Sequence, residues 1–553
     1  MRTIEYLRET GRRAARFRND RSGAIAIVFA LALLPVVGFI GAAVDYSRAN
    51  NAHAAMQKAA DATALNLSRD APKVTSAELQ QRANTQFAAI LNRPDIKNVA
   101  VSATYSQAGG PQLVLNAQGK VPTTFIGIAG IANMDLKVDS QAKWGNTRLR
   151  VALVLDTTGS MSDDGKMDAL KSAGKNLINQ LQSSASIDGD VYVSIIPFSK
   201  NVNVGPSHHA ATWIDWTEWE SEPDILKNSK PSNWSQVGPG SSCPFSYSAH
   251  GFSCSPTPTA ITTTSTIPSS GSFSGYICPS IDYGTKDPLK LARMYNGCYN
   301  SVAQNTTVAT GSQASCGTLP NCTCSGNGSN RVCTQLSYQH TWIKNARSTW
   351  NGCVADRGAA SGPSGDHDRK VTTPTTSDTA TLFPAEQNYY CSPVVRPLGF
   401  DWNGMRTAID ALYPAGTTNQ PIGLVWGWQS LVGGGPFPAP PVKDPAFTYR
   451  EVIVLMSDGL NTQNRWHGNG TTTNTNVDRR MYDSATVGTC ANVKAGGITI
   501  YAVHVNTDGD PKSTLLENCA SGPDKFWMVT SANALDAVFT QIGTELSQLR
   551  IAK

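Results

Sequence analysis

The stretch VALVLDTTGSMS at residues 151–162 decides the fold. Its first part, 151–155, is a short, unbroken apolar run, which is typical of a strand buried on both faces of a parallel sheet. The run stops at Asp156, and hydroxyl groups follow at Thr158 and Ser160. Polar groups just beyond the carboxyl end of a parallel strand lie where open α/β sheets place their ligands. Oxygen donors alone favour a hard cation such as Mg²⁺, whereas a strand ending in a polar turn is the alternative interpretation.

Short apolar runs alternate with helical segments along the rest of the chain. Strands are expected at 151–155, 191–198, 451–457, 498–505 and 526–529. Helices are expected at about 167–181, 404–412, 420–431 and 534–549. This alternation predicts an α/β fold with a doubly wound, Rossmann-like parallel sheet and right-handed crossovers.

Three polar loops belong to this predicted sheet. Asp156-x-Thr158-x-Ser160 follows the first strand, 416–419 opens a helix, and Asp458-Gly459 closes a later strand. Their order resembles that of von Willebrand factor type A domains, whose metal-ion-dependent adhesion site has Asp-x-Ser-x-Ser, then a threonine, then an aspartate. Thr158 stands where the family has its first serine. The threonine hydroxyl can still bind a metal ion, although its extra methyl group crowds the site.

The resemblance implies a complete set of metal-site residues. The hydroxyl ligands would be Thr158, Ser160 and Thr418, with Asp156 and Asp458 acting mostly through water. Thr417 is an alternative to Thr418, and the spacing to Gly423-Leu424 favours Thr418. The expected ion is Mg²⁺ or another divalent cation such as Mn²⁺.

Neutral direct ligands would leave the cation electrophilic, so a carboxylate from a protein partner can complete its octahedron. We therefore predict a binding site and not an enzyme with a small-molecule substrate. A metal-dependent hydrolase, the alternative, would need further carboxylates or histidines nearby. Asp163, Asp164 and Asp168 lie close in sequence, but they are interpreted as a solvated loop and the first turn of a helix. No paired general acid and base, nucleophile elbow or phosphate loop is recognisable in the sequence.

Charge and hydropathy indicate a membrane anchor at the N-terminus. Residues 1–21 hold seven arginines against three acidic residues, a net charge of +4, while the whole chain carries +5. The remainder is therefore nearly neutral, which argues against nucleic-acid binding. The 22 residues 23–44 carry no charge and are long enough to span a bilayer once. The positive-inside rule then places 1–22 in the cytoplasm and the bulk of the chain outside; a cleaved signal peptide is the alternative.

The segments 21–31, 44–46 and 57–62 resemble the N-terminal part of TadE/TadG-like proteins of the bacterial tight-adherence (Flp) pilus assembly system. Val28 stands where processed family members carry a glutamate, which favours a retained anchor and a TadG-like protein. The resemblance implies an inner-membrane protein facing the periplasm that binds a pilus or envelope component. A surface adhesin that contacts host or matrix is the alternative. Residues 45–147 are expected to form a pseudopilin-type stalk with a small α+β segment.

An insertion at 201–400 is expected to divide the type A domain into 148–200 and 401–553. It contains ten of the twelve cysteines and few aliphatic residues, so we expect disulfides to replace a hydrophobic core. Zinc binding by Cys316, Cys322, Cys324 and Cys333 is the alternative, although their spacing is irregular. The tryptophans of the insertion are interpreted as local core, with a carbohydrate-facing surface as the alternative.

The remaining two cysteines are predicted to form a disulfide. Cys490 and Cys519 flank the expected strand 498–505 and fall in helix-like segments that can lie side by side. The sequences around them also resemble the type A domains of TadG-like proteins.

Overall fold

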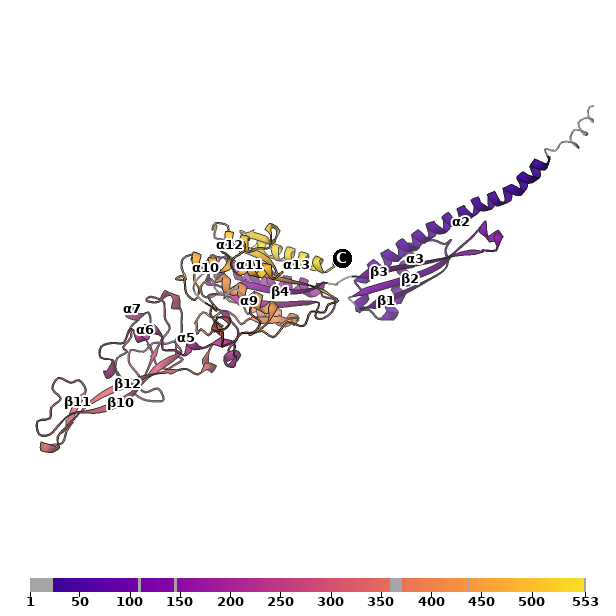
Figure 1. Ribbon diagram of the computed structural model, residues 1–553. Helices are drawn as coiled ribbons and strands as arrows, with labels where there is room; N and C mark the ends of the chain where they lie inside the picture. Colours follow the sequence, from indigo (N-terminus) through magenta and orange to yellow (C-terminus); the bar gives the residue numbers. More distant parts are fainter. Residues whose placement is uncertain (1–22, 108–110, 144–146, 359–369, 436, 552–553) are drawn as a thin grey trace, which may run out of the picture. The chain divides into compact units, whose positions relative to one another are not determined.

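The computed structural model describes residues 23–107, 111–143, 147–358, 370–435 and 437–551 (Figure 1). The chain forms two compact units. The N-terminal unit comprises residues 1–146 with 551–553, and the main unit comprises 147–550. Each is described by itself.

The N-terminal unit is built on one long helix, α2 (Gly23–Ser68). Among the described residues it is the one helix that is long and apolar enough to cross a membrane, over Ile27–Ser68. Its apolar side chains are exposed in the first half, where Phe39 is 78% exposed. In the second half a stripe of side chains at helical spacing is buried; it comprises Met56, Ala59, Ala60, Thr63, Ala64 and Leu67.

This buried half of α2 packs with α3 (Ser76–Leu91) over an antiparallel sheet. Thr75 caps α3 in a capping box with Glu78. The sheet has the order β1-β2-β3, with bounds β1 (Lys97–Ser106), β2 (Gln112–Pro122) and β3 (Asn133–Lys143). A 3-10 turn, η2 (Ile126–Ala129), lies in the connection between β2 and β3.

A six-stranded sheet of order β15-β5-β4-β16-β17-β18 forms the centre of the main unit. Five strands are parallel: β5 (Val191–Phe198), β4 (Thr147–Asp156), β16 (Thr448–Ser457), β17 (Thr499–Val505) and β18 (Phe526–Val529). The edge strand β15 (Arg396–Gly399) pairs antiparallel with β5 and was not expected, because it comes from the end of the insertion.

Helices cover both faces of this sheet. One face packs against α9 (Gln420–Val432), α10 (Thr475–Met481), α11 (Thr489–Ala495) and α12 (Thr514–Cys519). The other packs against α4 (Lys166–Ser184), α8 (Trp402–Asp410) and α13 (Leu535–Ile551). In β4, Ala152 and Val154 point to the first face, whereas Val151, Leu153 and Leu155 point to the second. This is why the strand reads as a continuous apolar run.

The insertion has an apolar core of its own, which corrects the expectation that disulfides would replace one. Its five-stranded sheet has the order β11-β12-β10-β9-β8. The bounds are β8 (Cys254–Ser255), β9 (Tyr276–Pro279), β10 (Gly297–Thr310), β11 (Cys322–Ser325) and β12 (Val332–Lys344). Phe245, Phe252, Ile277 and Tyr299 are buried together beside it. The expectation failed because these side chains are scattered in sequence and only the fold gathers them.

Short elements join the insertion to the rest of the main unit. They are the strands β6 (Val202–Asn203), β7 (Ile214–Asp215), β13 (Cys353–Val354) and β14 (Phe383–Pro384), and the helix α5 (Thr217–Glu220). Two further short helices, α6 (Asp224–Lys227) and α7 (Tyr247–His250), belong to the insertion itself. Trp213, Trp216, Trp219 and Trp350 are buried in the same core as α9, and Trp234 and Trp342 pack against the core of the insertion. These positions support the core interpretation of the tryptophans.

All cysteines of the insertion are in disulfides: Cys243–Cys254, Cys278–Cys298, Cys316–Cys322, Cys324–Cys333 and Cys353–Cys391. The sulfur atoms of Cys316 and Cys324 lie 3.4 Å apart, but each belongs to its own disulfide. The described residues therefore include no thiol that would support the zinc alternative.

Two glycines let α9 lie unusually close to the sheet. A Cβ at Gly423 would lie 2.6 Å from the Phe198 ring, and one at Gly427 would lie 2.4 Å from Val154 Cγ2. We expect Gly427→Ala to lower the free energy of unfolding by about 1–3 kcal/mol, because Val154 is buried in a central strand and has no room to move. Urea unfolding followed by tryptophan fluorescence measures the change.

Gly174→Ala in α4 is the matched control. There a Cβ would meet only the flexible end of Ile409, at 3.3 Å, and alanine favours the helix. Equal effects of the two substitutions would contradict the close packing of α9.

Candidate metal-binding site

Adjacent strand ends position the two predicted carboxylates. β4 ends at Asp156 and β16 ends at Ser457, directly before Asp458. The two strands are parallel neighbours in which Leu155 pairs with Met456, so both carboxylates emerge at the same edge of the sheet. The predicted site thus begins with two acidic residues about 300 positions apart in sequence that the pairing of two strands brings together.

Hydrogen bonds connect the hydroxyl groups of the first loop to these carboxylates. Thr158 Oγ1 lies 3.1 Å from Ser160 Oγ, which donates to Asp458 Oδ1 at 2.9 Å. The Thr158 amide donates to Asp156 Oδ1 at 2.8 Å. Ser457 Oγ donates to the other oxygen, Asp156 Oδ2. Four of the five predicted residues therefore belong to one continuous polar cluster.

The hydroxyl group of Thr418 lies near this cluster, next to Gly459. A Cβ placed on Gly459 would lie 3.8 Å from Ser160 Oγ and 4.0 Å from Thr418 Oγ1. Both hydroxyls thus border the space that the glycine leaves open. Thr417, the alternative, instead donates to Gln463 Oε1 at 3.0 Å. The geometry therefore favours Thr418 as the hydroxyl of the second loop.

Backbone hydrogen bonds hold the first two loops together. The Gly159 amide donates to Gly416 O at 2.9 Å, and the Ala415 amide donates to Thr157 O at 2.8 Å. Gly416 adopts φ +81°, a left-handed conformation that suits glycine. The first hydroxyl loop and the loop before α9 are thus fixed to each other without using a side chain of the site.

Both backbone and side-chain hydrogen bonds fix the third loop. The Thr462 amide donates to Thr418 O, and the Thr418 amide donates to Thr462 Oγ1, both at 3.0 Å. Gln420, the first residue of α9, donates to Ser457 Oγ at 2.9 Å and to Gly459 O at 2.7 Å. The oxygen atoms are therefore held in place by their surroundings, as in preorganised binding sites.

Burial makes the negative charge of the two carboxylates unfavourable in free energy. Asp156 is 0% exposed and Asp458 is 3% exposed. Burial, together with the nearby Asp458 carboxylate, raises the pKa of Asp156 to about 7. Burial also raises the pKa of Asp458, against the opposing effect of the Lys166 ammonium. A buried carboxylate needs a proton or a cation beside it.

Lys166 is a residue of the site that the sequence analysis missed. Its side chain is fully buried, and Nζ lies 3.1 Å from Asp458 Oδ2 and 2.6 Å from Asp508 Oδ2. Burial lowers its pKa, but the ion pairs with Asp508 and Asp458 raise it more. A lysine in the first turn of an amphipathic helix normally points to solvent, so the sequence carried no signal for this contact.

Lys166 compensates the charge of Asp458, with which it forms an ion pair. Asp156 instead accepts hydrogen bonds from Thr158 and Ser457, and neither of these residues is cationic. Ser457 and Gln420 were also missed, although a serine directly before Asp458 at a strand end is a weak signal. Asp163, Asp164 and Asp168 are exposed, in keeping with their interpretation as solvated. The set of oxygen donors, its excess negative charge and the space beside Gly459 fit a hard divalent cation.

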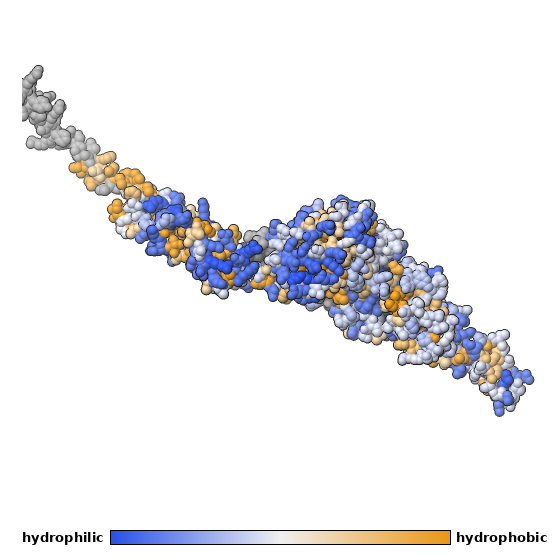
Figure 2. All heavy atoms as spheres, turned by 180° about the vertical axis from the view of Figure 1, so that it is seen from behind, coloured by the Kyte–Doolittle hydropathy of each residue, from blue (hydrophilic) through white to orange (hydrophobic). Residues whose placement is uncertain are grey.

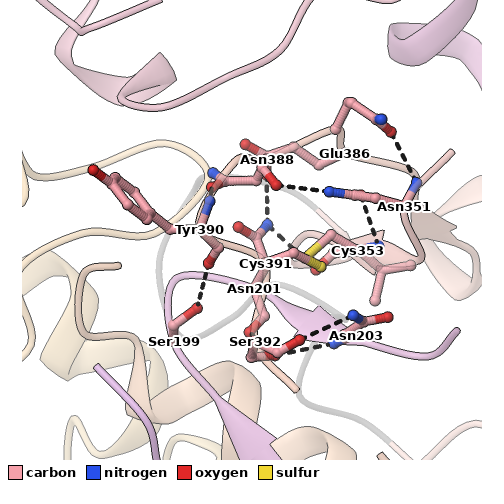
Figure 3. The surroundings of a disulfide bond; sticks show 12 residues. Ser199, Asn201, Asn203, Asn351, Cys353, Glu386, Asn388, Tyr390, Cys391 and Ser392 are labelled. Carbon is pink, nitrogen blue, oxygen red and sulfur yellow. Dashed lines mark hydrogen bonds between the residues drawn. A yellow bond between two sulfur atoms is a disulfide. The ribbon is translucent and has the colours of Figure 1, made fainter. Parts of the chain in front are cut away.

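The insertion borders the site. Tyr390 lies against the loop before α9, where a Cβ on Gly416 would come within 3.3 Å of it, and its carbonyl accepts from Ser199 Oγ at 3.4 Å (Figure 3). The neighbouring disulfide Cys353–Cys391 fixes this part of the insertion (Figure 3). Asn419 Nδ2 also donates to Asp356 Oδ2 at 2.9 Å. A molecule that approaches the oxygen cluster would therefore meet the base of the insertion as well.

Cys490 and Cys519 lie away from this cluster. They form a disulfide between α11 and α12, and both are fully buried in the core on the α9 face of the sheet. The pair stabilises this face and provides no group to the site.

The raised pKa of Asp156 predicts how stability depends on pH. Because the folded chain holds a proton on Asp156 more tightly than the unfolded chain, metal-free protein should lose stability as pH rises from about 4 to 7. The part of this loss that Asp156 causes is about 4 kcal/mol, from about 1.4 kcal/mol per pH unit, and the raised pKa of Asp458 adds to it. Urea unfolding in the presence of EDTA at several pH values measures it.

Asp156→Asn should flatten this pH dependence, because the amide does not titrate. Asp163→Asn, an exposed change in the same loop, should leave it as in the parent chain. A parent chain that gains stability over this range would contradict the burial of an uncompensated carboxylate.

Comparison with known proteins gives a family likeness for one segment. No curated protein matches the chain. Residues 23–65 match the family model described as putative Flp pilus-assembly TadE/G-like.

Similar solved structures include the pilus adhesin SpaC from Lactobacillus rhamnosus GG, at 11% identity and a TM-score of 0.27, covering 83% of this chain and 35% of that chain. The pilus adhesin RrgA from Streptococcus pneumoniae has 9% identity and a TM-score of 0.29, with coverages of 82% and 50%. The vWF domain of the type V pili tip protein Mfa5 from Porphyromonas gingivalis has 8% identity and a TM-score of 0.28, with coverages of 73% and 97%.

The chain spans about a third of the length of SpaC. TM-scores of this size carry no conclusion about the main unit. What the comparisons establish is that the segment 23–65 is similar to the TadE/G-like family of Flp pilus assembly.

Proposed function

We propose that this chain is a membrane-anchored protein of Flp-type pilus assembly whose main unit is a von Willebrand factor type A domain that binds a protein partner through Mg²⁺ or Mn²⁺. The family match of residues 23–65 supports the pilus part of the proposal. The observation that carries the binding part is the cluster of oxygen atoms between β4, β16 and the start of α9.

In this proposal the hydroxyls of Thr158, Ser160 and Thr418 hold the cation directly. Asp156 and Asp458 would act through water ligands of the ion, and Asp458 also accepts a hydrogen bond from Ser160. A carboxylate of the partner completes the coordination. The bound ion provides an electrophilic centre for that carboxylate, and the chain's own groups orient the ligands and exclude bulk water. None of these roles requires catalysis, so we infer a binding protein and not an enzyme.

The proposed location is the bacterial inner membrane, with residues 1–22 in the cytoplasm and the bulk of the chain in the periplasm. Residues 1–22 lie outside the described part of the chain. Six disulfides in the main unit support an oxidising compartment for that unit. The side chains around Tyr390 would then help to select the partner, because they border the cluster.

Mg²⁺ should stabilise the purified full chain against thermal unfolding. At a Mg²⁺ concentration 100 times its Kd the expected gain is about 2.7 kcal/mol, because only the folded chain assembles the site. Asp156→Ala should abolish the gain, whereas Asp163→Ala, an exposed change in the same loop, should retain it. Identical melting of the parent chain with and without Mg²⁺ or Mn²⁺ would refute the metal site.

Partner binding should depend on the same ion. We expect the tagged chain to retain an envelope protein in the presence of Mg²⁺ and to lose it in EDTA or with Ser160→Ala, as judged by mass spectrometry. Capture that is equal under all three conditions would contradict a metal-bridged contact. Protease access to the main unit on intact cells would indicate a surface adhesin instead of a periplasmic assembly protein.

A further inference from the structure

The connection between β2 and β3 is an apolar loop that leaves large apolar side chains exposed. Residues 121–134 carry no charged side chain. Phe125 is 41% exposed, Ile128 88% and Ile131 54%. Burying such side chains in water-free surroundings is favourable, so a cluster of three on one tight loop points to a contact that the loop makes elsewhere.

The loop is attached to α2 at the end of its uncharged segment. A Cβ on Gly41 would lie 2.5 Å from Cβ and Cγ of Phe125, so the phenylalanine rests directly on this glycine. One turn later, Asp45 is buried and accepts the amides of Thr124 at 3.0 Å, Phe125 at 2.7 Å and Ile126 at 2.9 Å. Figure 1 shows the end of the β2–β3 hairpin beside α2. Figure 2 shows apolar residues along α2 and on the adjoining end of the N-terminal unit.

These contacts place the loop at the level of the proposed bilayer surface. Gly41 lies three residues inside the uncharged segment 23–44, which is about 5 Å along the helix axis. Interfacial segments enter a bilayer to a depth of roughly 5–10 Å. A loop held against Gly41 therefore lies within reach of lipid whenever α2 spans the membrane.

The loop backbone is also suited to a water-poor environment. The amides at 124–126 donate to Asp45, and Thr123 donates through its amide to Ala132 O at 3.1 Å. The amides of Ile128, Gly130 and Ile131 donate to carbonyls within the loop at 3.2, 3.0 and 3.4 Å. Because unpaired amides are costly in lipid, this pairing lowers the free-energy cost of entry.

We propose that residues 123–131 insert into the outer surface of the bilayer that α2 spans, with Phe125, Ile128 and Ile131 in contact with lipid. The inference rests on the proposed membrane anchoring and adds a second contact to it. A helix alone can rotate and tilt in the bilayer, whereas a helix with an attached loop in the same interface presents the N-terminal unit in one orientation. Lipid is favoured over a protein partner because the loop has no charge and is attached at membrane level.

The test uses the full chain in lipid vesicles with a single added cysteine carrying an environment-sensitive fluorophore. All twelve native cysteines are in disulfides, so labelling without reductant is specific. The labelled positions are Ile128→Cys in the loop, Leu33→Cys in α2 and Thr104→Cys as the control. Thr104 is exposed and pairs with Val114, eight residues before Pro122 and thus about 26 Å from the loop along β2.

Quenching by spin-labelled lipids distinguishes the outcomes. We expect strong quenching at 33 by deep spin labels, several-fold stronger quenching at 128 by shallow labels than at 104, and a marked loss at 128 when Ile131→Asp is added. Quenching at 33 without quenching at 128 would overturn the inserted loop but leave the anchor intact. A blue-shifted but unquenched label at 128 would also overturn it, since a protein or a second copy would then cover the loop. Absence of quenching at both 33 and 128 would overturn the loop and the anchor together.

Discussion

The parallel pairing of β4 with β16 is the constraint on which the candidate site depends. Its register brings Asp156 and Asp458 to one edge of the sheet, where both are buried. Burying two carboxylates side by side is unfavourable unless positive charge accompanies them. Lys166 supplies one such charge from the start of α4 and leaves a deficit at Asp156. The hydroxyl groups and the space at Gly459 lie close to this uncompensated negative charge. The raised pKa of Asp156 reflects the same lack of positive charge.

The long insertion interrupts the chain without disturbing this arrangement. It leaves the sheet after β5 and returns through β15, which pairs with β5 itself. The disulfide Cys353–Cys391 and contacts such as Asn419 with Asp356 fix its base beside the loops of the site. Under the proposed function, an inserted segment anchored there would provide a recognition surface next to the ion.

The N-terminal unit also contains a buried aspartate with a structural role. A single carboxylate, Asp45, fixes an apolar loop by accepting three successive amides. At the candidate metal site and at this loop alike, the neighbours of a buried aspartate supply hydrogen-bond donors or charge. The two residues differ in their partners. Backbone amides donate hydrogen bonds to Asp45, whereas Asp156 has a raised pKa and can therefore bind a proton or an ion.

The sequence by itself determined the features that depend on local order. The apolar run 151–155, the oxygen-bearing residues after it and the uncharged segment 23–44 are recognisable because strand burial, ligand chemistry and membrane length leave short-range patterns. Only the tertiary structure decided that Thr418 and not Thr417 borders Gly459, that Lys166 is buried, and that the insertion has an apolar core. These features depend on contacts between segments up to hundreds of residues apart, and no periodicity or composition records which distant side chains will meet.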